Sequence, residues 1–124
     1  MDMNRNIIKQ KSFSFAIRIV RLNRFLCSEK KEFVISKQLL RSGTSIGANV
    51  FESGRAVSTK DFISKIGIAQ KEADETLYWI ELLYATDYLT YTQYISLKED
   101  CEELIRILMA ISKTMSQKCE KKML

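Results

Sequence analysis

The sequence predicts an all-α fold, a four-helix bundle built from a single domain of 124 residues. The chain contains no proline and only four glycines, whereas all-β and α/β domains need such residues at their frequent turns. Apolar residues also recur at helical spacing along four segments, which are joined by short polar stretches. The expected helices cover residues 12–28, 36–54, 59–86 and 92–117, followed by a frayed basic tail over residues 118–124.

The expected first helix, residues 12–28, carries two apolar stripes side by side. One consists of Phe13, Ile17 and Val20, and the other of Phe15, Ile19, Leu22 and Leu26. An apolar arc this wide exceeds what one face of a bundle needs. One stripe is therefore free to pack against a surface outside the bundle, such as a neighbouring copy of the chain.

The expected second helix, residues 36–54, starts at the candidate N-cap Ser36 and includes the stripe Leu39, Ile46 and Val50. Its middle is weak in helix propensity, but Gly43 and Gly47 lie four residues apart. We interpret this stretch as helix rather than loop, with the two glycines permitting another helix to approach closely.

The third and fourth helices have the clearest periodicity. In the third, Ser58 or Thr59 caps the N-terminus and Asp61 lies in the first turn, where the helix dipole favours an acid. Its core stripe is expected to consist of Phe62, Ile66, Ala69, Ala73, Ile80 and Leu83. The fourth helix repeats Leu97, Cys101, Leu104, Leu108, Ile111 and Met115 in heptad spacing. Short links make consecutive helices antiparallel neighbours, which predicts an up-down-up-down bundle.

The absence of histidine excludes most catalytic chemistry. No Ser-His or Cys-His pair, histidine base or Glu-x-x-His metal motif can form, and no phosphate-binding glycine loop is present. The three cysteines, Cys27, Cys101 and Cys119, form no CxxC pair, and we interpret them as reduced thiols, two of which (Cys27 and Cys101) help to fill the core. We therefore expect no enzyme activity, no metal and no cofactor.

The formal net charge of +5 is unevenly distributed. Residues 1–55 carry eleven Lys and Arg against four acids, while residues 56–124 carry nine against eleven. Such asymmetry favours a polyanionic partner or self-assembly. The candidates for phosphate contact are Lys11, Arg18, Arg21, Arg24, Lys37 and Arg41. No apolar run is long enough to span a membrane and no signal peptide is visible, so a cytoplasmic location is expected.

Polar residues also interrupt the apolar faces of the second and third helices. Charges at such positions cost free energy unless they are paired, so we expect the two polar faces to meet, with Arg41 and Asn49 satisfying carboxylates of the third helix. The network would fix helix register or a subunit contact, the alternative being direct contact with a ligand or nucleic acid. Its candidate members are Arg41, Ser45, Asn49, Glu52, Lys65, Glu72, Glu75 and Trp79.

Two runs of the sequence resemble the four-helix bundle proteins also called the 23S rRNA intervening-sequence, or S23, family. The Ser-Ile-x-x-Asn-x-x-Glu element corresponds to Ser45, Ile46, Asn49 and Glu52. The Lys-Asp-Phe and Lys-Glu-x-x-Glu-x-x-Tyr-Trp elements correspond to Lys60, Asp61, Phe62, Lys71, Glu72, Glu75, Tyr78 and Trp79. The resemblance covers roughly residues 12–115, and Glu52-Ser53 stands where many members have Glu-Gly.

This resemblance implies an antiparallel bundle that assembles as a homopentameric ring without catalytic residues. Because accessory proteins of diversity-generating retroelements form a related branch, it also implies binding of RNA or DNA or of a partner such as a reverse transcriptase. The leading hypothesis is an oligomeric protein that binds RNA or DNA phosphates. The alternatives are an adaptor ring that docks a partner enzyme and a structural assembly with no affinity for nucleic acid.

Overall fold

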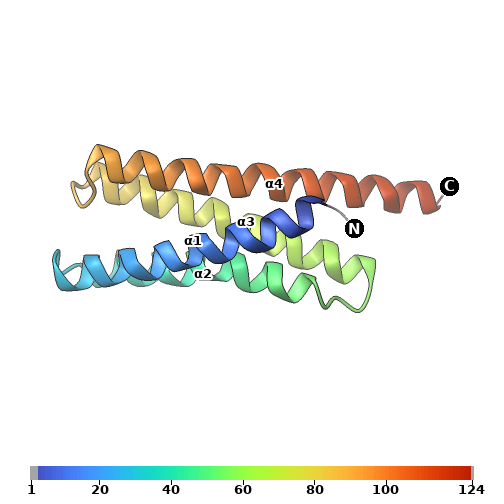
Figure 1. Ribbon diagram of the computed structural model, residues 1–124, viewed down its shortest axis with the longest axis horizontal. Helices are drawn as coiled ribbons and strands as arrows, with labels where there is room; N and C mark the ends of the chain where they lie inside the picture. The colour runs from blue at the N-terminus through green and yellow to red at the C-terminus, as the bar shows by residue number, and fades with distance from the viewer. Residues whose placement is uncertain (1–2, 124) are drawn as a thin grey trace.

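The computed structural model describes residues 3–123, and within that range the chain forms four helices and no strand (Figure 1). They are α1 (Met3–Ser28), α2 (Ile35–Ser53), α3 (Thr59–Ala85) and α4 (Tyr91–Met123). The start of α1, the α2–α3 link and the end of α4 lie at one end of the molecule, and the other two links lie at the opposite end. The predicted all-α class and four helices are confirmed.

Two predicted helix boundaries are wrong. Helix α1 begins at Met3 rather than near residue 12, because Ile8 is only 1% exposed and extends the buried stripe by one turn before Ser12. Helix α4 continues through residues 118–123, where a frayed tail was expected. No glycine or proline interrupts this stretch, and Lys118 and Lys121 suit the negative end of the helix dipole. Leu124 lies outside the described residues.

The N-termini of α2 and α3 are capped differently. Ser58 caps α3 as predicted, since its hydroxyl accepts a hydrogen bond from the Asp61 N–H over 3.0 Å. Ser36, by contrast, is not the N-cap of α2, which begins at Ile35. The buried Glu32 accepts hydrogen bonds from the N–H groups of Ser36 (2.7 Å) and Val34 (3.1 Å), and thereby satisfies the first turn from outside the helix.

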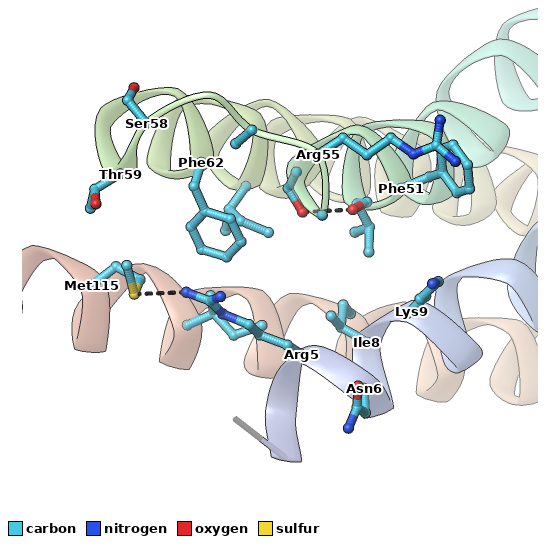
Figure 2. Close-up of a pocket in the computed structure, with 16 residues that line it drawn as sticks. Arg5, Asn6, Ile8, Lys9, Phe51, Arg55, Ser58, Thr59, Phe62 and Met115 are labelled. Carbon is cyan, nitrogen blue, oxygen red and sulfur yellow. Dashed lines mark hydrogen bonds between the residues drawn. The ribbon is translucent and has the colours of Figure 1, made fainter. Parts of the chain in front are cut away.

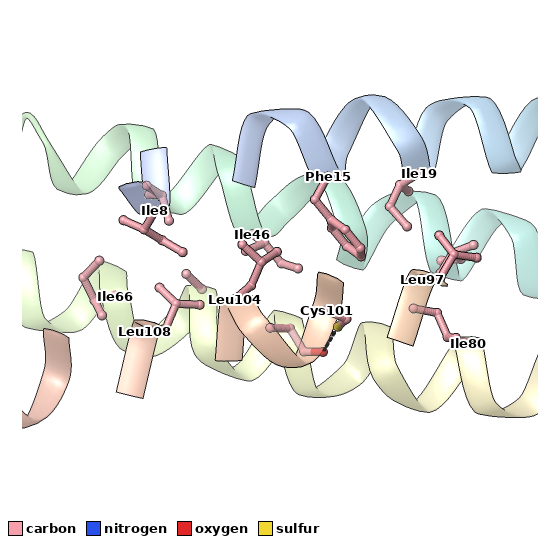
Figure 3. Packing of buried hydrophobic residues seen from close by; sticks show 14 of the residues in the cluster. Ile8, Phe15, Ile19, Ile46, Ile66, Ile80, Leu97, Cys101, Leu104 and Leu108 are labelled. Carbon is pink, nitrogen blue, oxygen red and sulfur yellow. Dashed lines mark hydrogen bonds between the residues drawn. The ribbon is translucent and has the colours of Figure 1, made fainter. Parts of the chain in front are cut away.

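One stripe of each helix forms the core (Figure 3). The heptad stripe of α4, the Leu39, Ile46 and Val50 stripe of α2 and the predicted core stripe of α3 are all buried. In α1 the structure chooses between the two stripes. Phe15, Ile19 and Leu26 are buried, whereas Phe13 is 68% exposed and Ile17 is 39% exposed. Cys101 is buried and Cys27 is half-buried.

The glycines of α2 permit α1 to pack closely against it, as predicted. A Cβ atom on Gly43 would lie 2.7 Å from Cγ1 of Ile19, and one on Gly47 would lie 3.2 Å from the carbonyl oxygen of Ser12. α2 also packs extensively on α3, and α3 on α4, whereas the contact between α1 and α4 is the smallest. The bundle is therefore least tightly closed along the α1–α4 seam.

Candidate functional site

Arg41 joins α2 to α3 through two carboxylates. Its guanidinium donates to Oε2 of Glu72 over 3.0 Å and also to Oε2 of Glu75. The indole N–H of Trp79 donates to the same Glu75 oxygen over 3.1 Å. The Trp79 hydrogen bond lowers the pKa of Glu75, partial burial raises it and Arg41 lowers it, with the result that this pKa lies below its usual value. Glu75 thus accepts hydrogen bonds from both Arg41 and Trp79, whereas Glu72 accepts one from Arg41.

The other members of the predicted polar network lie along the same face of α2 or opposite it. Lys65 forms an ion pair with Glu52, with 3.7 Å between Nζ and Oε1, and this pair links α3 to α2. Ser45 donates to the carbonyl of Arg41. Asn49, expected to satisfy a carboxylate of the third helix, instead donates to the carbonyl of Ser45 within α2 over 2.8 Å. Its short side chain finds an acceptor one turn back in its own helix.

A buried hydroxyl pair beneath this network was missed at the sequence level. Thr76 Oγ1 lies 2.9 Å from Ser42 Oγ and also donates to the carbonyl of Glu72 over 2.7 Å. Both hydroxyl residues are fully buried. The available signal was Thr76 itself, which occupies a core position between Ala73 and Ile80 in the apolar stripe of α3.

Two of the basic residues proposed for phosphate contact are paired with acids of α4. Lys11 forms an ion pair with Glu103 over 3.0 Å, and Arg18 forms one with Asp100 over 2.6 Å. Arg18 also donates to the hydroxyl and carbonyl of Ser96. These cations bridge the α1–α4 seam, so their charge is already largely compensated within the chain.

Three other candidates for phosphate contact, Arg21, Arg24 and Lys37, are exposed. Over residues 3–123, no carboxylate lies within ion-pair distance of any of them. Arg21 and Arg24 are three residues apart on α1 and therefore project from neighbouring positions on one side of the helix. Arg21 also lines a shallow pocket with Phe25 and Gln93. The structure thus divides the six predicted cations into three paired and three unpaired residues.

The end of the bundle that holds the α3–α4 link carries an aromatic cluster that sequence reasoning did not identify. The rings of Tyr84 and Tyr94 stack with centroids 4.1 Å apart, and Tyr91 lies edge-on to Tyr84 at 6.1 Å. The Tyr94 hydroxyl donates to Glu81, which also forms an ion pair with Lys98. The sequence signal that could have indicated this cluster is the position of Tyr84 just before the α3–α4 link and of Tyr91 and Tyr94 just after it.

The opposite end of the bundle contains a pocket lined by Arg5, Lys9 and Arg55, which were also outside the predicted set (Figure 2). Sequence reasoning missed Arg5 and Lys9 as site residues because it placed them before the first helix.

Within the described part of the chain, no group of three or more Cys, Asp or Glu side chains is placed to hold a metal ion. None of the helices over residues 3–123 is long and apolar enough to cross a membrane.

Comparison with known proteins places the chain in a family. The sequence model of the 23S rRNA-intervening sequence protein family matches residues 4–110. A crystal structure of a protein with unknown function from the S23 ribosomal protein family of Bacteroides thetaiotaomicron VPI-5482 superimposes with a TM-score of 0.88. It is 55% identical to this chain, and the match covers 90% of this chain and 99% of that one. No curated protein matches the chain. The chain therefore belongs to the 23S rRNA-intervening sequence protein family.

Proposed function

We propose that the chain is a non-catalytic RNA-binding protein of the cytoplasm, built from antiparallel up-down-up-down bundles that assemble as a homopentameric ring. The observation that carries the proposal is the set of exposed, unpaired cations Arg21, Arg24 and Lys37. Cations without a carboxylate partner are free to replace the counterions of a phosphate backbone. The family description, which refers to 23S rRNA, favours RNA as the polyanion.

Self-assembly is supported by the apolar stripe of α1 that the core leaves uncovered. Phe13 and Ile17 are exposed on α1, and Ile68 is 41% exposed on α3. A second copy of the chain would bury such residues, and closed rings are a common way to do so. A ring of five copies would carry a formal charge of about +25, so that the weak field of one chain becomes a strong one.

The test is RNA binding by fluorescence anisotropy at increasing salt, with a charge-reversed variant. Arg21→Glu/Arg24→Glu should weaken binding by more than tenfold at low salt and reduce the slope of log K against log salt by about 1.4 to 1.8 for each subunit that contacts the RNA, the loss of two phosphate contacts. The matched control is Lys113→Glu/Lys118→Glu, which makes the same charge change at exposed positions on α4. Equal losses for the two variants would refute a localised site, and wild-type protein that binds no RNA at low salt would refute the function.

A protein-binding adaptor is the second candidate, favoured by Phe33 and Val34. These neighbouring apolar residues are exposed in the α1–α2 link, where the core does not use them. A partner enzyme such as a reverse transcriptase could bury them. Oligomeric protein that binds such an enzyme but no RNA, and that loses the enzyme on Phe33→Ser, would favour this function over the first.

A further inference from the structure

Two neighbouring sides of the bundle carry apolar residues that the core does not use. Over residues 3–123, α1 packs on α2, α2 on α3, α3 on α4 and α4 on α1, whereas the diagonal pairs do not pack on each other. The helices therefore stand at the corners of a square. The side formed by α1 and α2 meets the side formed by α2 and α3 at roughly a right angle, with α2 as the shared corner.

The first of these sides, which we call the α1–α2 face, includes the uncovered stripe of α1. Phe13 and Cys27 are two heptads apart and so lie on the same side of the helix. The sulfur of Cys27 is 3.6 Å from the hydroxyl of Ser36, which places that side next to α2. Ile17, one turn after Phe13, continues the stripe. The exposed apolar residues of α1 therefore border α2 rather than α4.

Helix α2 adds a second aromatic ring to this face. Phe51 is one turn after Gly47, whose backbone lies against Ser12 of α1. Phe13 is 68% exposed and Phe51 is 52% exposed. With about 200 Å² for each aromatic residue, their exposed parts alone amount to roughly 240 Å². An apolar area of a few hundred Å² on one side of a small protein is typical of a contact surface.

The second side, the α2–α3 face, has the aromatic composition of an interface centre. Ile68 and Glu75 are seven residues apart on α3, and Glu75 accepts a hydrogen bond from Arg41, so Ile68 lies beside α2. The exposed ring of Tyr78 packs edge-on against Trp79, with 5.0 Å between centroids. The indole N–H already donates to Glu75, so a partner can cover this face without leaving that donor unpaired.

Charge prevents the α1–α2 face from packing on itself. Arg24 and Lys37 lie at one end of it, and Lys9 and Arg55 lie at the other. Over the described residues, no carboxylate forms an ion pair with any of these four cations. Two copies that met through this face would bring like charges together, which costs free energy.

The α2–α3 face has no such excess of positive charge. Arg41 is paired with Glu72 and Glu75, and Lys65 is paired with Glu52. Its three carboxylates outnumber the two cations that they bind. A copy of the chain that presents the α2–α3 face is therefore a better partner for the α1–α2 face than a copy that presents the α1–α2 face.

The proposed ring of five requires two different faces of this kind. A face that packs on itself closes a dimer, whereas head-to-tail contacts between unlike faces build rings. In a closed ring the two faces must point about 108° apart for five copies and about 90° apart for four. Neighbouring sides of a square bundle satisfy this condition. Opposite sides do not, because they would build an open filament.

We propose that copies of this chain assemble head-to-tail, the α1–α2 face of one copy covering the α2–α3 face of the next. Phe13 and Ile17 of one copy then pack on Ile68 and Tyr78 of its neighbour. Helix α2, the corner that the two faces share, lines the inside of the ring, and α4 lies on the outside. The subunit number of five in this inference rests on the proposed function.

This arrangement directs cations toward the axis of the ring. Lys37 and Arg55 are eighteen residues apart, which is about five helical turns, so both project from the same side of α2. That side faces the axis when α2 forms the inner wall. Arg21 stays outside the contact, because it lies on the side of α1 that forms a pocket with Gln93 and Leu97 of α4.

Native mass by light scattering in line with size exclusion tests the inference. Phe13→Glu puts an unpaired carboxylate in the α1–α2 face, and Ile68→Glu puts one in the α2–α3 face. Each variant should reduce the native mass about fivefold, from the ring to a single chain. Met109→Glu changes an exposed apolar residue of α4 outside both faces and, as the matched control, should leave the ring intact. Circular dichroism of each variant verifies that the helices persist.

Mixing the two charge variants distinguishes a head-to-tail contact from a contact between like faces. Each variant keeps one intact face, so the mixture should form a dimer with one copy of each and no ring. If the α1–α2 face packed on itself, Phe13→Glu would dissociate while Ile68→Glu kept that contact, and the inference would be overturned.

Crosslinking by a bismaleimide is an independent readout on the assembled ring. In a Cys27→Ser/Cys119→Ser background, Phe13→Cys combined with Ile68→Cys should give a ladder of covalent oligomers on a denaturing gel. Either cysteine alone should give no crosslinked product. A covalent dimer from Phe13→Cys alone, or a mixture that stays monomeric together with no ladder, would overturn the head-to-tail contact.

Failure of this inference is distinguishable from failure of the proposed function. Monomeric wild-type protein refutes the ring and this contact together. A wild-type ring that both charge variants retain refutes the contact and leaves the ring. A ring that dissociates in both charge variants but binds no RNA supports the contact and refutes the RNA-binding function.

Discussion

Replacing Gly43 by alanine tests the close packing of α1 on α2. The added Cβ would lie 2.7 and 2.8 Å from the two γ-carbons of Ile19, which is fully buried and β-branched and therefore has little room to move. Overpacking of this kind costs about 1–3 kcal/mol. The higher helix propensity of alanine than of glycine raises the free energy of unfolding by about 1 kcal/mol. We therefore expect Gly43→Ala to lower the free energy of unfolding by about 0–2 kcal/mol.

Gly67→Ala is the matched control, because it makes the same change in the interior of α3 at an exposed position with no atom within 4 Å of the new Cβ. It should raise the free energy of unfolding by about 0.5–1 kcal/mol. Urea unfolding followed by circular dichroism, with all variants at one protein concentration, should separate the two alanine variants by about 1–3 kcal/mol.

A double variant identifies the cause of that difference. Ile19→Ala removes the two γ-carbons that the new methyl group would meet at 2.7 and 2.8 Å and leaves the Cβ at 3.2 Å. Most of the cost of Gly43→Ala should therefore disappear in its presence, with a coupling free energy of about 1–3 kcal/mol. If Gly43→Ala proves as stable as Gly67→Ala, the close approach of the two helices is refuted.

Three further predictions follow from buried or paired groups. Arg41→Met should lower the free energy of unfolding by about 1–2 kcal/mol, because Glu72, with its side chain only 12% exposed, loses its cation; urea unfolding no different from wild type would contradict this. Burial, with nearby carboxylates, raises the pKa of Cys101 to about 12, so Ellman's reagent at pH 8 should modify the half-buried Cys27 and Cys119 in the folded protein and Cys101 only on unfolding. Burial raises the pKa of Glu32, but hydrogen bonds from the start of α2 outweigh it and hold this pKa below 4.5. The ionised Glu32 therefore stabilises the fold above pH 4.5, and this stabilisation is lost as the pH falls below that value. In Glu32→Gln the melting temperature should depend less on pH in that acid range than it does in wild type. The same pH dependence in both proteins would contradict this.

The core faces of α2, α3 and α4 could be predicted from the sequence because apolar residues at helical spacing mark one stripe in each, whereas α1 carries two stripes and only the structure distinguishes them. In α4 every predicted position, from Leu97 to Met115, is buried. The start of α1 was missed because Ile7 and Ile8 stand in a polar stretch, and the burial of Ile8 depends on the distant α3 and α4. Local patterns contain no information on such tertiary contacts.

The candidate site was less predictable, because its charges depend on the register between helices. The sequence identified Arg41, Glu72 and Glu75 as polar residues on facing helices. It could not indicate that Arg18 would pair with Asp100, since that pairing is set by how far α1 slides along α4. Arg21 and Arg18 therefore looked equivalent in the sequence, and only the fold distinguishes them.

The native mass, measured by light scattering in line with size exclusion with and without a structured bacterial RNA, tests the proposed function most directly. At low salt we expect a mass near five times the 14.4 kDa of one chain, increasing when RNA is added. At high salt the oligomer should persist and the RNA should dissociate, because apolar contacts hold the ring whereas phosphate contacts are screened. A stable monomer, or an oligomer whose mass RNA does not change at either salt concentration, would contradict the proposal.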